Sequence, residues 1–233
     1  MHRPSPGSGW WTIGVRLPSF RLAAALRHTV SPDATAFLIE RHRRRVLEAS
    51  DAAARGGVRP GMPLRAATRL LPRAAVVIDD APRIARTWRR VLDLLARLPV
   101  QVDDGGPGVA YLAVPRGDRP ERWFARVRGR LEPLGLTVRC GAGATRFVAI
   151  VATHRVTDTV CPLGREAAFV ADAPLELLCL DDEVALRLRL LGARTVGDFA
   201  ALPPAYFYRF GGDARRLHEL AYGGCETTTV RYR

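Results

Sequence analysis

The N-terminal part of the chain combines a short strand pattern with several stretches of helical spacing. Apolar residues alternate with small or polar ones from Trp11 to Leu17, which predicts a strand that ends at Pro18. Apolar positions then recur at helical spacing, and turn residues separate the three helices expected over 20–28, 34–50 and 63–71. A brief β-branched run at 75–78 precedes an amphipathic helix predicted over 82–98. We therefore expect a small helical insertion between two strands.

Two apolar segments in the middle of the chain predict a β-hairpin. They span 98–102 and 109–114, and they flank four residues that permit a tight reversal of the backbone, Gly105, Gly106, Pro107 and Gly108. Beyond the hairpin the pattern predicts a helix over 120–134, a strand over 136–140 and a helix over 145–154. This order of elements is typical of an α+β fold.

After Pro162 the pattern becomes wholly helical. The short helices that it predicts cover 174–179, 182–191, 196–202, 204–210 and 213–222. The final CETTTVRYR is polar and β-prone, which indicates the start of a linker or a loose tail. The change of pattern marks a boundary between two parts of the chain.

Composition and charge narrow the classes of partner. The 233 residues are 48% hydrophobic and carry a formal net charge of +13, and every one of the 36 basic residues is arginine. This excess favours a polyanionic partner such as DNA over an acidic small molecule. No apolar run approaches the roughly 20 residues of a membrane span, and the N-terminus lacks the apolar core of a signal peptide. A cytoplasmic protein without a membrane segment is expected.

The sequence offers no metal or cofactor motif. Its four cysteines are far apart without CxxC spacing, and its five histidines lack ligand spacing. We therefore predict no metal site, no disulfide framework and no cofactor.

The segment from Ala185 to Pro204 predicts a helix-hairpin-helix. A helix ends at Leu191, Gly192 permits a tight turn, and Thr195 and Asp198 mark the start of a second helix. Backbone amides at such a turn can bind a phosphate oxygen whatever the base. The candidate DNA-binding residues are Arg187, Arg189, Gly192, Arg194, Thr195 and Gly197. The alternative is an ordinary helix pair closed by a glycine cap.

Several motifs together resemble the Y-family (DinB/UmuC-type) translesion DNA polymerases. The strand VAYLAV resembles the family's Asp-Glu-Ala-Tyr-Leu strand, GVRPGMPLRAA resembles its fingers motif, and GAGATRFVAIVAT its last palm helix. The resemblance implies an α+β fold with a ferredoxin-like palm, a helical fingers insertion and a helical thumb. It predicts a palm over 1–18 and 80–163, fingers over 19–79, a thumb over 164–225, and a linker or tail over 226–233, with the family's little finger absent.

The resemblance also identifies positions where the family's catalytic groups are missing. In the family, carboxylates hold two divalent cations that drive phosphoryl transfer. The metal-binding positions fall here on Arg16, Pro18, Gly108 and Val109. The positions that hold the triphosphate fall on Asp51, Ala54 and Ile150, and the sugar-discriminating aromatic is Arg21.

Two other acidic pairs are candidates for a displaced metal site. Asp103 and Asp104 fall several positions before the family's pair, and we interpret them as exposed turn residues. Asp79 and Asp80 match no motif, and we interpret them as the N-terminal cap of the helix that follows. Neither pair is expected to bind metal.

The loss of every catalytic group on a retained scaffold is similar to the ImuB branch of the family. That resemblance implies a protein without polymerase activity, an adaptor or DNA-binding accessory in translesion synthesis and damage-induced mutagenesis. The partners implied are weakly bound primer-template or damaged DNA, a mutagenic replicative-type polymerase, a RecA-like accessory protein and the sliding clamp. Two alternatives remain: an active nucleotidyl transferase with an unrecognised acid set, and a protein-interaction scaffold that does not bind DNA.

Overall fold

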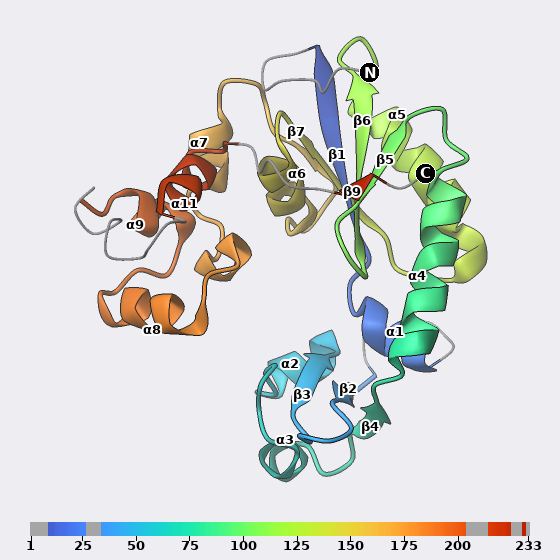
Figure 1. Cartoon of the computed structure of the whole chain (residues 1–233), viewed down its shortest axis with the longest axis vertical. Coiled ribbons are helices and arrows are strands. Elements are labelled where there is room, and N and C mark those ends of the chain that lie inside the picture. The colour runs from blue at the N-terminus through green and yellow to red at the C-terminus, as the bar shows by residue number, and fades with distance from the viewer. Residues whose placement is uncertain (1–8, 27–33, 204–213, 225–229, 232–233) are drawn as a thin grey trace.

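A six-stranded sheet forms the centre of the molecule. The computed structural model describes residues 9–26, 34–203, 214–224 and 230–231, and the sheet has the order β8-β7-β1-β6-β5-β9 (Figure 1). Its strands are β1 (Trp10–Arg16), β5 (Gln101–Asp104), β6 (Val109–Pro115), β7 (Arg139–Gly143), β8 (Thr159–Val160) and β9 (Val230–Arg231). The predicted N-terminal strand and the hairpin are confirmed. β1 runs antiparallel to both β6 and β7, so its C-terminal end is enclosed on both sides.

Different helices cover the two faces of this sheet. Ile13 and Val15 of β1 point to the same face of the sheet. There they form a core with Trp88 of α4 (Ala81–Leu95) and Trp123 of α5 (Pro120–Leu131). The opposite face packs against α6 (Arg146–Thr153). Figure 1 shows α4 and α5 on one side of the sheet and α6 on the other. Both helices predicted over 82–98 and 145–154 are confirmed.

Glycines in the strands let α6 lie directly on the sheet. A Cβ atom added at Gly14 would lie 2.9 Å from the carbonyl oxygen of Ala149. One added at Gly141 would lie 2.5 Å from the Cβ of Ala152. Both distances are shorter than van der Waals contact, so any residue larger than glycine at these positions would push α6 away from the sheet. The glycines therefore fix α6 close to the end of β1.

A small lobe, residues 36–78, follows α1 (Phe20–Leu26). Its three-stranded sheet has the order β3-β2-β4, with β2 antiparallel to β3 and parallel to β4. Its elements are β2 (Ala36–Ile39), β3 (Val46–Ala49), α2 (Asp51–Arg55), α3 (Leu64–Leu70) and β4 (Ala75–Ile78). Gly57 and Gly61 adopt left-handed backbone conformations, at φ 93° and 83°, in the loop between α2 and α3.

The helix predicted over 34–50 is wrong, because the structure forms β2 and β3 there. All four residues of β2 are buried, and a short apolar run does not distinguish a buried strand from a helix. The chain reverses at Arg44, whose φ is 50°, and the amide of Glu40 donates to the carbonyl of Arg45. The lobe that we expected to be helical is therefore mixed α and β.

The helical lobe, residues 166–221, contains the C-terminal helices. They are α7 (Glu166–Val170), the 3-10 turn η2 (Leu175–Leu178), α8 (Asp182–Leu190), α9 (Val196–Ala200) and α11 (Ala214–Ala221). Its core joins Val170, Leu188 and Phe199 to Val148 and Val151 of α6, so one helix contacts both the sheet and this lobe. The helix predicted over 204–210 lies outside the described residues.

Two boundaries in the central sheet differ from those predicted. β7 begins at Arg139, three residues after the expected start. Near the C-terminus, Val230 and Arg231 pair with Asp104 and Asp103 as strand β9, so these two residues do not form the loose tail that was one of the two expectations. The exposed edge of β5 offers unpaired backbone groups that a polar, β-prone segment can bond. Among the described helices, none combines the length and apolar character that a bilayer crossing requires.

Candidate functional site

Arg16 ends β1 and reaches across to the last turn of α6. Its Nε donates to Oγ1 of Thr153 at 3.2 Å, and its Nη2 donates to the carbonyl oxygen of Thr153 at 3.1 Å. The carbonyl end of a helix favours a cation. Burial lowers the pKa of the Arg16 guanidinium, neighbouring Arg139 lowers it further, and Asp51 raises it. The family resemblance implies a metal-binding aspartate at this position, and here it is an arginine whose side chain is hydrogen-bonded to α6.

His154, directly after α6, lies in the field of this arginine. Burial lowers the pKa of His154 to about 4, with a further contribution from the charge of Arg16. The imidazole is therefore neutral at physiological pH, although its unperturbed pKa is near 6.5. Arg139 is the direct cross-strand neighbour of Arg16, so this end of the sheet is positively charged.

Gly108 lies at the end of the hairpin in a conformation that suits glycine. Its φ is 96°, and its carbonyl oxygen accepts a hydrogen bond from the amide of Leu17 at 2.8 Å. A Cβ added there would lie 3.0 Å from the Cβ of Phe20. An L-residue at this position is strained by its backbone and crowded by α1. The neighbouring Val109 pairs directly with Arg16.

The other positions expected from the resemblance are spread over several elements. Pro18 follows β1 and is half-buried, and Ile150 packs from α6 against the core of the helical lobe. Asp51 and Ala54 lie on α2, and Asp51 is close enough to influence the pKa of Arg16. The structure therefore brings Arg16, Val109 and Asp51 toward one end of the sheet.

Asp103 and Asp104 are not exposed turn residues, which corrects our interpretation. Asp103 is buried in β5, where it forms an ion pair with Arg146 and accepts a hydrogen bond from Nε2 of Gln101 at 3.0 Å. The guanidinium of Arg146 lies 5.4 Å from the centre of the Tyr111 ring. Burial between neighbouring strands, which no local pattern reveals, makes Asp103 structural.

Asp104 has two hydrogen-bond donors of its own. Its Oδ1 accepts from Nε1 of Trp88 at 2.9 Å and from the amide of Gly106 at 2.8 Å. The first bond ties the hairpin to α4, and the second closes the turn. Both carboxylates of this pair are therefore used within the protein.

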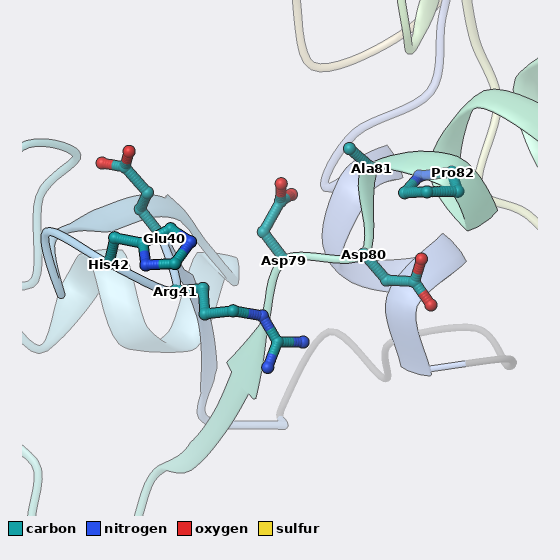
Figure 2. Close-up of a pocket in the computed structure, with 7 residues that line it drawn as sticks. All are labelled: Glu40, Arg41, His42, Asp79, Asp80, Ala81 and Pro82. Atoms are coloured by element: carbon teal, nitrogen blue, oxygen red, sulfur yellow. The ribbon is translucent and has the colours of Figure 1, made fainter.

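A hollow lies between the small lobe and the start of α4. Figure 2 shows its lining residues, Glu40, Arg41, His42, Asp79, Asp80, Ala81 and Pro82. Asp80 accepts a hydrogen bond from the amide of Arg83 at 3.1 Å, which confirms it as the cap of α4. Asp79 is not a cap, because it pairs with Arg21 at 3.0 Å.

These acidic residues do not assemble a metal centre. Within the described parts of the chain, no group of three or more histidine, cysteine, aspartate or glutamate side chains is arranged to hold a metal ion. Arg21, at the expected sugar-discriminating position, instead links α1 to the junction before α4.

The predicted helix-hairpin-helix segment forms two helices joined by a tight turn. Gly192 has φ 87°, and Thr195 and Asp198 form a capping box at the start of α9. The amides of Arg194 and Thr195 both donate to Oδ2 of Asp198 at 2.9 Å. A phosphate that used these amides would therefore have to displace the Asp198 carboxylate.

The remaining candidates in this segment also have partners. The amide of Gly197 donates to the carbonyl of Ala171 at 2.8 Å, and a Cβ on Gly197 would lie 2.8 Å from the same oxygen. Arg187 pairs with Glu183 and Arg189 with Glu176, in exposed ion pairs. Such pairs exchange readily with solvent ions, so their guanidinium groups can still contact DNA phosphates.

Sequence reasoning missed three residues that define this region. Thr153 anchors Arg16, Arg146 neutralises Asp103, and Arg139 lies beside Arg16. The adjacent Thr153 and His154 at the end of a predicted helix could have indicated a polar terminus, but their partner lies more than a hundred residues away. Only the packing of α6 on β1 reveals it.

Comparison with known proteins identifies a family and relatives that this chain resembles. A family model described as the impB/mucB/samB family matches residues 23–154. DNA polymerase IV from Caulobacter vibrioides is 28% identical over 178 residues, which cover 72% of this chain and 44% of the relative. DNA polymerase IV from Alkalilimnicola ehrlichii is 30% identical over 195 residues, which cover 76% and 53%. The chain thus spans about half the length of these relatives.

Solved structures support the same assignment. The crystal structure of DinB from Sulfolobus solfataricus superposes with a TM-score of 0.72 at 19% identity, covering 91% of this chain and 67% of that one. An insertion ternary complex of Dbh DNA polymerase gives a TM-score of 0.69 at 18% identity, covering 91% and 67%. The expected α+β, Y-family palm-like fold is confirmed. The chain belongs to the impB/mucB/samB family, with a Y-family, DinB/UmuC-type polymerase fold.

Proposed function

We propose that this protein is a non-catalytic, Y-family polymerase-like adaptor or DNA-binding accessory in translesion synthesis and damage-induced mutagenesis. The proposal rests on one observation. The family's metal-binding positions fall on an arginine tied to α6, a glycine with positive φ and a valine opposite that arginine, namely Arg16, Gly108 and Val109. Two-metal phosphoryl transfer needs carboxylates at these positions.

The electrostatics at the end of β1 support the same conclusion. A guanidinium beside a second arginine repels divalent cations, because like charges in a partly buried site are weakly screened. Asp51 is the acidic residue near Arg16, and Asp103 is engaged by Arg146. In this proposal the protein keeps the scaffold of a polymerase and has lost its chemistry.

DNA is the partner that the charge favours. The net charge of +13 attracts a polyanion. In the proposal, phosphate contacts come from the exposed arginines of α8 and the turn that follows it, Arg187, Arg189 and Arg194. In the proposed arrangement residues 1–18 and 80–163 form the palm, 19–79 the fingers and 164–225 the thumb. The resemblance to the ImuB branch adds a mutagenic replicative-type polymerase, a RecA-like protein and the sliding clamp as proposed partners, in the cytoplasm.

Primer extension and DNA binding together test the proposal. The purified protein is incubated with a primer-template and nucleotides in Mg²⁺ or Mn²⁺, and its affinity for the same DNA is measured against salt. We expect no extension and an affinity that falls steeply with ionic strength. Metal-dependent extension would identify an active nucleotidyl transferase, as the polymerase IV names of the relatives suggest. Absence of salt-dependent binding would identify a protein-interaction scaffold instead.

A further inference from the structure

The outer side of the palm-like sheet carries a row of arginines that the proposed function does not use. α4 and α5 bury one stripe each against the sheet, including Trp88 and Val91 on α4 and Phe124 and Val127 on α5. Their opposite stripes face solvent, on the side of the sheet away from α6 and the helical lobe (Figure 1). We define the outer arginine face as Arg86, Arg90, Arg97, Arg119, Arg122 and Arg126, all of them exposed.

The spacing of these residues gathers them along two neighbouring helices. Arg86 and Arg90 are four residues apart on one stripe of α4, and Arg97 follows two residues after the helix ends at Leu95. Arg122 and Arg126 repeat the four-residue spacing on α5, which contacts α4. An array on two adjacent helices matches an extended chain of negative charges better than a single small anion.

Acidic residues balance only part of the charge of this face. Residues 81–100 contain five arginines and one acidic residue, and residues 116–134 contain six arginines and three acidic residues. Across the described chain, ion pairs engage arginines elsewhere, such as Arg21, Arg146 and Arg155, but none of the six residues of the outer arginine face. Their field is therefore available to a partner.

One of these arginines is held in place by an aromatic ring. The guanidinium of Arg126 lies 4.6 Å from the centre of the Trp123 ring, and Nε1 of Trp123 donates to Asp118 at 3.2 Å. Stacking occupies the face of the guanidinium and leaves its edge free to donate hydrogen bonds. The ordered side chain loses little entropy when it binds a phosphate.

The residues absent from the face identify the class of partner. In the described chain the large exposed apolar side chains, among them Leu70, Ile78, Leu186 and Leu190, lie on other elements than α4 and α5. A protein interface normally has an apolar or aromatic centre, and a single-stranded nucleic acid needs exposed rings for base stacking. Arginine without either favours the sugar-phosphate backbone of a duplex.

We propose that the outer arginine face binds the backbone of double-stranded DNA, as a second nucleic-acid site separate from the contacts proposed for the helical lobe. The contact is independent of base sequence, because phosphates carry no sequence information. It needs no divalent cation. Binding at this face does not require the adaptor role, but holding two DNA segments at once rests on the proposed function, in which Arg187, Arg189 and Arg194 bind the first segment.

Salt-dependent binding of a blunt duplex tests the site. The triple variant Arg86→Gln, Arg90→Gln, Arg97→Gln keeps helix propensity nearly constant while it removes three charges. Loss of three phosphate contacts lowers the slope of log K against log salt by about 3 in magnitude. The matched control, Arg65→Gln, Arg69→Gln, Arg73→Gln, removes three exposed arginines of the small lobe and leaves the slope unchanged. Equal losses in both variants would show an effect of net charge alone and would overturn the proposal.

A bridging measurement separates this site from the proposed function. Bead-bound duplex should retain a second, labelled duplex through the wild-type protein but not through the α4 variant. The α4 variant should still bind a primer-template in the presence of EDTA, and unfolding curves should match those of the wild type. Retention that does not differ between the two proteins would contradict the site, as would preferential capture of polyglutamate over duplex. Primer extension tests the adaptor proposal independently, and its result does not bear on bridging.

Discussion

Arg16 and Val109 face each other directly across β1 and β6, and the side chain of Arg16 turns from this pair to the last turn of α6. The guanidinium donates to Thr153 and changes the pKa of His154. At this end of the sheet, a cation therefore links a strand to a helix.

Placing carboxylates at positions 16, 108 and 109 should therefore not produce polymerase activity. In the triple variant Arg16→Asp, Gly108→Asp, Val109→Glu, an acid replaces the cation at the carbonyl end of α6, and an L-residue takes the positive φ of position 108. We expect no primer extension in Mg²⁺ or Mn²⁺, and a free energy of unfolding lower by about 2–4 kcal/mol. Robust extension by a folded triple variant would disprove this account.

Two glycines of the hairpin should respond differently to alanine. Gly106 and Gly108 have nearly equal φ values, 97° and 96°, but a Cβ meets no atom within 4 Å at Gly106 and meets Phe20 at Gly108. Gly106→Ala should cost about 1 kcal/mol of unfolding free energy, from the backbone alone. Gly108→Ala should cost more, because Phe20 must also move. Denaturant unfolding measures both, and equal losses would mean that the contact with α1 is unimportant.

Stability should fall in mild acid because of His154. Its pKa is about 4 in the folded protein, against an unperturbed value near 6.5, so the unfolded chain binds more protons between these values. The contribution of this histidine to stability is therefore complete above pH 6.5 and is lost as the pH falls toward 4. Unfolding free energies measured across this range should show a shallower slope in His154→Gln.

The same histidine reports on Arg16. Replacing Arg16 with methionine removes a positive charge that lowers the pKa of His154, so that pKa should rise. The NMR titration of His154 in the wild type and in Arg16→Met measures the change. Because burial is the larger cause, the pKa should stay below its unperturbed value, and an unchanged titration would place the two groups out of contact.

Arg146→Met should be strongly destabilising. Only 10% of the Asp103 side chain and 16% of the Arg146 side chain are exposed, so the variant leaves a nearly buried carboxylate without its partner. The loss should be about 3–5 kcal/mol, and adding Asp103→Leu should recover part of it. As a control, Arg187→Met breaks the exposed pair with Glu183 and should change stability by less than about 1 kcal/mol. Similar losses at the two pairs would argue against burial as the cause.

The sequence by itself determined the elements whose signals are local. The apolar stripe of α4, its Asp80 cap, the glycine-rich hairpin and the capping box of α9 each depend on residues a few positions apart, and the structure has all of them. The sequence motifs also indicated the family and the α+β fold class. Such features need no knowledge of distant neighbours, because capping, turn geometry and helical periodicity act within one or two turns of the chain.

Only the tertiary structure decided features that depend on distant partners. Burial on both sides makes 36–39 a strand in a lobe expected to be helical, and pairing with β5 makes 230–231 a strand. In the folded chain Asp103 forms a buried ion pair, and Arg16 donates a hydrogen bond to Thr153, 137 residues away in the sequence. Burial and charge pairing are properties of neighbours in space. The sequence motifs can therefore suggest which positions correspond to the family's carboxylates, but only the packing of α6 on the sheet shows that Arg16 contacts Thr153.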